Sequence, residues 1–243
     1  MFYLCTFEFI KNCNRYIVME NVVISTVSSL LVQLVIGVFC IYGLSFELDK
    51  SQIVLRELLI VETIVQSIEF IFYLFILYVI LTSGLANVTS IRYFDWFLTT
   101  PMMLISIVVY LVFKTKNSET NEQISMISIV EKYWNDLSFI LICNSLMLIF
   151  GYLGETNVIN IYYASIIGFI FFFAAFYRIY SKFVQGTIFE KEFFLIFGIW
   201  SLYGVAALLE PVYKNNMYNT LDIFSKNIMG LFLYYQVRKA SSQ

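Results

Sequence analysis

A lysine lies within a largely apolar stretch near the end of the chain, and an aspartate precedes it by four residues. These residues, Asp222 and Lys226, belong to the segment 218–237. On a helix, this spacing places both side chains on one face, one turn apart. An ammonium group at the centre of a bilayer costs roughly 3 kcal/mol or more, so a lysine there indicates a functional site. Two chemistries would retain it: an ion pair with a carboxylate, or a Schiff base formed with an aldehyde.

A second group of chemically active side chains falls in the run RYFDWFLTTPM of an earlier apolar segment. Asp95 and Thr99 are four residues apart and therefore face the same site, with Trp96 beside them. The proline of this run removes a backbone hydrogen bond and can bend the helix. Trp200 and Tyr203 lie three residues apart in a later segment. Together with Trp96 they provide aromatic walls suited to a flat, conjugated ligand.

Further ionisable residues fall inside apolar segments, where a bilayer disfavours them. Charged groups in a low dielectric are cheapest to hold as close pairs of opposite sign. Residues that only form hydrogen bonds between membrane helices are usually Ser, Thr or Asn, because these side chains cost less free energy to bury. The sequence therefore predicts a compact cluster of cations and carboxylates, drawn from Glu62, Glu69, Arg92, Asp95, Asp222 and Lys226.

The composition is that of a membrane protein. Of the 243 residues, 60% are hydrophobic and only 13% are charged. The absence of histidine excludes most transition-metal sites and the common Ser-His and Cys-His triads. The 4 cysteines lack metal-ligand spacing, and the sequence contains no basic stripe or phosphate-binding loop. We therefore expect no enzyme activity, no bound metal and no nucleic-acid partner.

Seven apolar segments have the length and pattern of membrane-spanning helices. The sequence thus predicts an all-α membrane protein in which seven transmembrane helices form one bundle. No internal repeat is evident, and nothing in the sequence suggests a second domain. The predicted helices cover residues 21–43, 53–81, 93–113, 135–152, 158–180, 190–209 and 218–237.

The sequence also predicts the nature of the segments before and between these helices. Residues 1–18 are expected to be an N-terminal extension, an amphipathic or disordered extracellular arm, and residues 19–243 the seven-helix domain. Either Met1 or Met19 is the true start. Residues 114–135 are expected to be a polar, charged connector. Turns are expected at Asn87, at Asn157 and at the pair Asn215 and Asn216.

The distribution of lysine and arginine predicts the orientation in the membrane. If the N-terminus is extracellular, 3 basic residues (Lys11, Arg15 and Lys214) lie outside, whereas 10 lie near the inner ends of the helices. Loops rich in lysine and arginine are retained on the cytoplasmic side. The C-terminus is therefore expected to be cytoplasmic. The 10 inner residues are Lys50, Arg56, Lys114, Lys116, Lys132, Arg178, Lys182, Lys191, Arg238 and Lys239.

These sequence runs resemble those of the microbial rhodopsins, the retinal-binding seven-helix photoreceptors. The runs R-Y-x-D-W-x-x-T-T-P and L-D-x-x-x-K are together highly specific to that family, and the resemblance covers nearly the whole chain after Met19. It implies that all-trans retinal is the cofactor and that Lys226 forms its Schiff base. Asp95 and Asp222 would be the counterions, and Arg92 would lie on their extracellular side. Light would then move the N–H relative to Asp95 and favour transfer of the proton toward it.

The same resemblance assigns further side chains to the retinal pocket. Thr100 and Asn144 would form a hydrogen-bonded pair between the third and fourth helices that influences the speed of the photocycle, although algal members commonly carry aspartate at the position of Asn144. Gly204 is another departure, because most of the family has a proline there. The pocket residues implied are Trp96, Thr99, Thr100, Met103, Asn144, Trp200 and Tyr203.

Two features bear on whether the pigment is a pump or a channel. An outward proton pump of the best-known type has a carboxylic proton donor seven residues after Thr99, where this chain has Ser106. Glu62 and Glu69 are two helical turns apart on one face, about 10.5 Å at 1.5 Å per residue. Carboxylates along a wet seam attract cations, as they do in cation channels generally. Glu57 continues this acidic character toward the cytoplasmic side.

The polar line on the second helix resembles that of channelrhodopsins, in which a serine, a glutamate and an asparagine form a central gate. The matching residues would be Ser29, Glu62 and Asn227, with Gln33 and Glu69 extending the line. The gate and the small size most resemble the viral channelrhodopsins, which would place the protein in a host-cell membrane.

We therefore expect a retinal-binding, light-gated channel for monovalent cations in the lipid bilayer. Loss of the proton from the retinal-bearing lysine would accompany its opening, and protons would be further partners. An outward proton pump and a sensory photoreceptor are the alternatives, and assembly into a homo-oligomer is left open.

Overall fold

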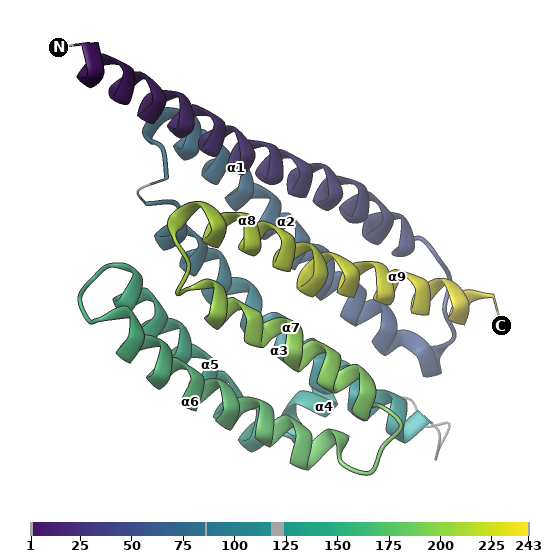
Figure 1. Ribbon diagram of the computed structural model, residues 1–243. Coiled ribbons are helices and arrows are strands. Elements are labelled where there is room, and N and C mark those ends of the chain that lie inside the picture. The colour runs from purple at the N-terminus through teal and green to yellow at the C-terminus, as the bar shows by residue number, and fades with distance from the viewer. Residues whose placement is uncertain (1, 86, 118–123, 243) are drawn as a thin grey trace.

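The computed structural model describes residues 2–85, 87–117 and 124–242, with side chains from Met19 onward. Its long helices lie roughly along one common direction, and the N- and C-termini are at opposite ends of the bundle (Figure 1). Three short elements interrupt or link the helices: the 3₁₀ turn η1 (Lys50–Gln52) and the π-helical turns η2 (Tyr180–Val184) and η3 (Ile223–Asn227). The helices are α1 (Phe2–Gly43), α2 (Ile53–Ser83), α3 (Val88–Asn117), α4 (Met126–Lys132), α5 (Trp134–Glu155), α6 (Ile161–Ile179), α7 (Glu190–Ala206), α8 (Pro211–Asp222) and α9 (Ile228–Ser241).

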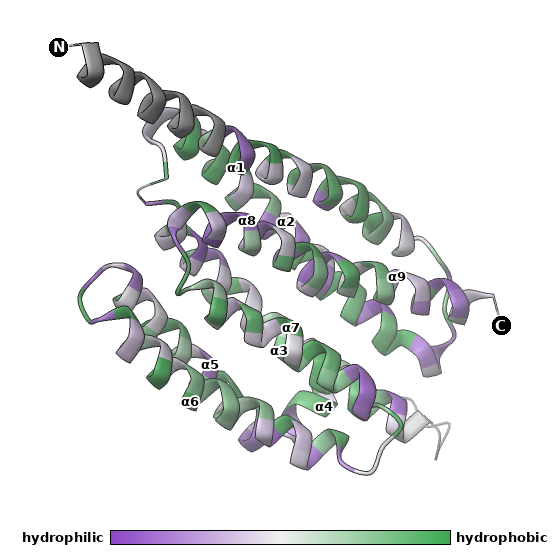
Figure 2. Cartoon of the chain, viewed as in Figure 1, coloured by the Kyte–Doolittle hydropathy of each residue, from purple (hydrophilic) through white to green (hydrophobic). Residues whose placement is uncertain are grey.

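The predicted seven-helix architecture is confirmed, because α8, η3 and α9 follow one another without a break and form the seventh helix. Five helices in the described part of the chain are long and apolar enough to cross a membrane by length and composition. The other two are α7, which has only 17 residues, and the seventh helix, whose first part is polar. Hydrophobic residues cover most of the long helices, while hydrophilic residues gather near their ends and on α8 (Figure 2).

The first helix starts earlier than expected. Helix α1 begins at Phe2 and not near residue 21, and no proline or glycine interrupts the sequence from there to residue 36. Without such a residue, nothing in the backbone ends the helix. The side chains of residues 2–18 are outside the described part, so the division of the chain at residue 18 stays a prediction.

The prediction of a turn at Asn215 and Asn216 was wrong, because both lie inside α8, which begins at Pro211. Proline is favoured in the first turn of a helix, where its missing N–H costs nothing. The Asn215 amide donates to the Pro211 carbonyl oxygen at 2.7 Å, and its side-chain oxygen accepts a hydrogen bond from Arg92. These contacts outweigh the general preference of asparagine for turns.

Other boundaries differ by a few residues. Helix α3 begins at Val88 and extends to Asn117, and the connector that follows contains the short helix α4. Helix α6 begins at Ile161 and not at residue 158, because Asn157 has a positive φ of 59° and the Asn160 side chain caps the helix by accepting from the Tyr162 amide. The expected turns at Asn87 and Asn157 are confirmed.

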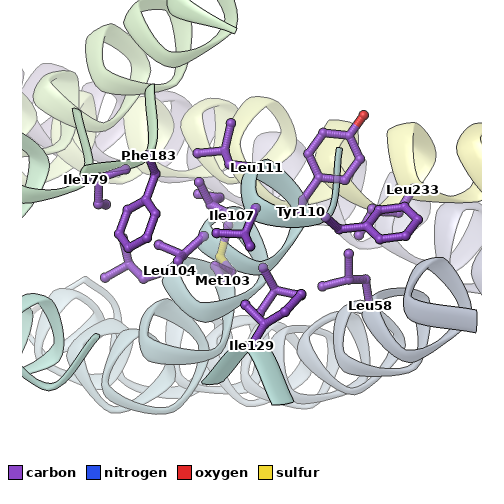
Figure 3. Packing of buried hydrophobic residues seen from close by; sticks show 14 of the residues in the cluster. Leu58, Met103, Leu104, Ile107, Tyr110, Leu111, Ile129, Ile179, Phe183 and Leu233 are labelled. Atoms are coloured by element: carbon purple, nitrogen blue, oxygen red, sulfur yellow. The ribbon is translucent and has the colours of Figure 1, made fainter. Parts of the chain in front are cut away.

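The predicted cytoplasmic half of the bundle is packed with apolar side chains around α3. Leu104, Ile107 and Leu111 of α3 pack there with side chains of α2, η2 and α9, including Leu58 and Phe183 (Figure 3). Lipid chains are as apolar as leucine, so close packing holds these helices together more than transfer out of water does. In the part of the chain that the structure describes, this packing presents mainly apolar side chains on this side of α3.

The hairpin of α5 and α6 has a close helix contact that a single substitution should disrupt. A Cβ atom on Gly154 would lie 2.5 Å from the Cβ of Ala164. Gly154→Val should therefore separate the two helices and lower the free energy of unfolding by about 1–3 kcal/mol. Thermal denaturation in detergent would measure this. Gly198→Val is the control, because a Cβ there meets no atom within 4 Å, and equal destabilisation by both changes would contradict the prediction.

Candidate functional site

Lys226 lies in the π-helical turn η3, near the middle of the seventh helix. This turn is continuous with α8 and α9, so the side chains of Asp222 and Lys226 both enter the interior of the bundle. Both residues are buried, with relative exposures of 0% and 1%. A π turn widens the helix locally and often occurs at functional sites.

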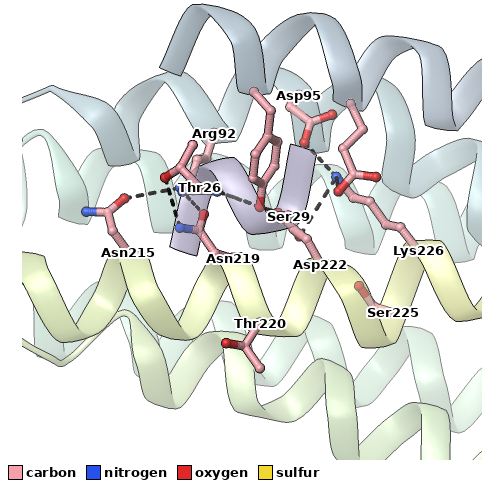
Figure 4. A network of polar contacts seen from close by, with 12 residues as sticks. Thr26, Ser29, Arg92, Asp95, Asn215, Asn219, Thr220, Asp222, Ser225 and Lys226 are labelled. Atoms are coloured by element: carbon pink, nitrogen blue, oxygen red, sulfur yellow. Dashed lines mark hydrogen bonds and ion pairs between the residues drawn. The ribbon is translucent and has the colours of Figure 1, made fainter. Parts of the chain in front are cut away.

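Three carboxylates surround the Lys226 amine. Its Nζ donates to Asp95 Oδ2 at 2.6 Å and lies 3.9 Å from Asp222 Oδ1 and 3.9 Å from Glu69 Oε1 (Figure 4). Asp95 comes from α3, Asp222 from the end of α8 and Glu69 from α2. The expected cluster of lysine and carboxylates is therefore present. Glu69 was among the predicted members of this cluster as well as of the ion path, but helical spacing alone did not predict that it, and not Glu62, lies beside the lysine.

Asp222 is held by several donors. Tyr73 and Tyr203 donate to its two oxygens at 2.6 Å and 2.7 Å, and Arg92 Nη1 lies 3.5 Å from Oδ2. Tyr203 also shares a 2.6 Å hydrogen bond with Ser225. Sequence reasoning missed Tyr73, although it lies four residues after Glu69 and hence on the same face of α2.

Arg92 continues the network on the predicted extracellular side of the lysine. Its guanidinium donates to the side-chain oxygens of Asn215 and Asn219 and, at 3.1 Å, to the Tyr73 hydroxyl. The Asn219 amide in turn donates to Thr26 at 3.0 Å (Figure 4) and to Ser25 at 2.7 Å, and these bonds link α8 to α1. A buried arginine needs several acceptors, and here amide and hydroxyl oxygens supply most of them.

An apolar cavity extends from Lys226 between α3, α5, α6, α7 and the seventh helix. Trp96 and Trp200 line it as expected, as do Tyr203, Thr100 and Met103. Trp96 meets Tyr203 edge to face, with ring centroids 5.5 Å apart. Thr100 accepts a 2.8 Å hydrogen bond from the Asn144 amide. The pairing predicted between the third and fourth transmembrane helices is therefore present.

Thr99 lies one turn from Asp95 but does not bond its carboxylate. The Thr99 hydroxyl donates to the backbone oxygen of Asp95 at 2.9 Å, a bond that stays within α3. The Asp95 carboxylate is thus held through Oδ2 by Lys226, and its Oδ1 has no hydrogen-bond partner among the described residues. Asp95 is accordingly far less constrained than Asp222.

The expected gate residues line a seam between α1, α2 and η3, but they do not bond to one another in the part of the chain the structure describes. Ser29 accepts from Gln33 at 3.2 Å, Glu62 accepts from Gln66 at 3.4 Å, and Asn227 donates to the Asp222 backbone oxygen at 3.4 Å. All of these side chains are buried. Several of their oxygens lack any hydrogen-bond partner among the described residues: Gln33 Oε1, Glu62 Oε2, Gln66 Oε1, both oxygens of Glu69, and Asn227 Oδ1.

A seven-helix membrane bundle with a buried lysine, its carboxylates and an aromatic cavity defines the class of seven-helix retinal proteins. A sequence profile described as bacteriorhodopsin-like protein matches residues 22–240. The chain therefore belongs to the bacteriorhodopsin-like family, the microbial rhodopsins.

Individual relatives agree with this assignment. The chain is 25% identical to a green-light absorbing proteorhodopsin from the gamma-proteobacterium EBAC31A08, over 81% of this chain and 80% of the relative. The crystal structure of viral rhodopsin OLPVRII is 26% identical, with a TM-score of 0.78 over 90% of this chain and 98% of that chain. A blue light-absorbing proteorhodopsin from Med12 shares the fold, with 22% identity and a TM-score of 0.71 over 91% of this chain and 99% of that chain. The resemblance to microbial rhodopsins, including viral ones, is confirmed.

Membership of this family implies a retinal chromophore, and the cavity fits one. Its lining is almost entirely apolar and aromatic, with a few polar groups, as in most pockets for small organic ligands. Lys226 supplies an amine at its polar end. Retinal would be held there by Lys226, with Trp96 and Trp200 along the polyene and Asp95 beside the nitrogen.

Proposed function

We propose that this protein is a light-gated cation channel and that monovalent cations cross it along the seam between α1, α2 and η3. The observation that carries the proposal is the row of buried oxygens without hydrogen-bond partners among the described residues, on Gln33, Glu62, Gln66, Glu69 and Asn227. A buried acceptor left without a donor costs about 1–3 kcal/mol. Water and cations entering the seam would satisfy these oxygens.

The charge balance around the lysine also supports passage of cations. Two buried cations, Lys226 and Arg92, face three buried carboxylates, those of Glu69, Asp95 and Asp222. Glu62 adds a further carboxylate on the same helix as Glu69. Retinal bound at Lys226 would supply light absorption. Transfer of the proton from the Lys226 nitrogen to Asp95 leaves the net charge of the cluster unchanged but removes the cation beside Glu69 and Asp222. Their carboxylates then attract a cation into the seam.

An outward proton pump is the second candidate. The direct 2.6 Å contact between Lys226 and Asp95 provides a proton acceptor that such a pump requires. On the opposite side of the lysine, however, Ser106 is buried and its hydroxyl has no partner among the described residues. A serine at this position does not replace a carboxylic acid as the proton donor, because its hydroxyl is far too weak an acid.

Recording under voltage clamp distinguishes the candidates. A cation channel is expected to give light currents that reverse sign, with a reversal potential that follows the sodium and potassium gradients. A pump current keeps one direction over the accessible voltage range, and a sensor gives little current with a long-lived photoproduct. Currents of one direction under all gradients would overturn the channel proposal.

We predict that Glu62→Gln changes the sodium-to-potassium permeability ratio or the closing rate severalfold. The reason is that Glu62 contributes a charge to the seam, whereas Lys226 already has three nearer carboxylates. The absorption maximum should therefore change little. Reversal potentials and visible spectra measure the two effects. Glu131→Gln, on an exposed position of α4, removes the same charge outside the seam and is the control. Unaltered permeability and kinetics in Glu62→Gln would contradict its role.

A further inference from the structure

The wall of the retinal cavity includes the seam between α6 and α7. Besides Tyr203, whose hydroxyl bonds Asp222 in the interior, four residues there line the cavity and are half-buried: Ser165, Phe169, Gly204 and Ala207. Three of the four have small or absent side chains. Among these four, Phe169 alone has a large side chain.

The Phe169 ring is what closes this wall. A Cβ atom on Gly204 would lie 2.4 Å from Phe169 Cζ and 2.7 Å from Cε2, so the ring occupies the space that a side chain at position 204 would take. On the lipid side, Phe169 stacks on Phe173, with centroids 5.7 Å apart and planes at 26°. Phe173 does not line the cavity, and 51% of its surface is exposed. Phe169 thus spans the distance from cavity to lipid.

Other parts of the cavity wall are closed by buried side chains such as Tyr93 and by contacts between helices. A Cβ atom on Gly151 would lie 2.7 Å from the Tyr93 hydroxyl, and the close contact of Gly154 with Ala164 brings α5 and α6 together. The end at Lys226 is occupied by carboxylates and by the Arg92 network. An apolar molecule would have to break ion pairs to pass there, and that is costly in a buried site.

Retinal is an apolar polyene that dissolves in the bilayer and must reach an amine inside the bundle. We propose that it is taken up laterally from the lipid between α6 and α7, and that the Phe169 ring seated on Gly204 is the door. Rotation of one aromatic side chain opens this route, whereas the other routes require separation of packed helices. The inference rests on retinal binding at Lys226 and is independent of what the pigment conducts.

The test follows pigment formation after all-trans retinal is added to the retinal-free protein in lipid vesicles. Phe169→Ala removes the door, and we expect the visible band to appear severalfold faster than in the unaltered protein. Phe171→Ala is the matched control: Phe171 stacks on Phe150 of α5 with centroids 5.9 Å apart, in the neighbouring seam. We expect its rate to be unchanged. Phe169→Leu, which keeps an apolar side chain, should give a smaller acceleration. It replaces the alanine variant in this test if that variant does not fold.

A second measurement separates a door from general loosening of the bundle. Hydroxylamine is a water-soluble nucleophile, so it should reach the retinal-bearing nitrogen from the polar side and bleach the finished pigment at an unchanged rate in Phe169→Ala. Faster uptake with unchanged bleaching supports the inference. Equal uptake in all variants, acceleration in Phe171→Ala instead, or a parallel rise of both rates would overturn it. Absence of any pigment in the unaltered protein would overturn it together with the retinal assignment, whereas the channel proposal is tested separately by currents.

Discussion

Replacing Lys226 with alanine is expected to abolish the visible absorption band completely. The amine is the nucleophile that would bind the chromophore, and it lies at the end of the aromatic cavity. Of the side chains that line this cavity, Lys226 alone carries an amine. Spectra of the purified protein with added all-trans retinal measure the effect.

The alanine variant also leaves the carboxylates of Glu69, Asp95 and Asp222 without their cation, which is strongly destabilising for a buried pair, by about 3–5 kcal/mol. Lys226→Arg avoids this cost, because guanidinium keeps the charge but does not condense readily with an aldehyde. It too should lack the band while the protein still folds. Lys214→Ala is the control, since Lys214 lies on α8 in an ion pair with Glu155 at 2.8 Å, away from the cavity. A normal visible pigment in Lys226→Arg or Lys226→Ala would refute the attachment site.

Asp95→Asn is expected to shift the absorption maximum to longer wavelength and to slow proton transfer from the Lys226 nitrogen by at least tenfold. A negative charge at 2.6 Å stabilises the ground state, in which the positive charge sits on the nitrogen. Excitation moves this charge along the polyene, so removal of the carboxylate narrows the gap between the two states. Flash spectroscopy measures the transfer, and a steady-state spectrum measures the shift.

Asp222→Asn is the informative comparison. Asp95 has one bonded side-chain partner, whereas Asp222 accepts from Tyr73 and Tyr203 and pairs with Arg92. The neutral amide at 222 should therefore lower the thermal stability and the yield of pigment more than the same change at 95. If Asp95→Asn left both colour and proton transfer unchanged while Asp222→Asn altered them, the roles of the two carboxylates would be exchanged.

Much of the site could be predicted because its key residues share single helices. The spacing is four residues both from Asp222 to Lys226 and from Asp95 to Thr99. In any α-helix, residues with this spacing lie on the same face. The cost of burying a charge then required partners for Lys226 and Arg92. Length and hydropathy likewise predicted the seven-helix bundle, because a bilayer requires helices of about 20 apolar residues.

The partners on other helices were harder to predict. Periodicity shows that Glu62 and Glu69 lie on one face of α2, but not how deep or at what rotation α2 packs against η3. The structure brings Glu69 to 3.9 Å from Lys226, and it brings Tyr73 to Asp222. The seventh helix begins seven residues earlier than predicted because Asn215 finds an acceptor in its own first turn and a donor in Arg92.

The sequence by itself determined the helices, the membrane environment and the lysine with its two aspartates, because these depend on local spacing and on the solvation cost of charge. The tertiary structure alone decided which glutamate accompanies the lysine, which amides hold Arg92, and where the cavity approaches the lipid beside Phe169. Each of these depends on how one helix is placed against another. That placement results from packing between distant segments, which the pattern within any one segment does not specify.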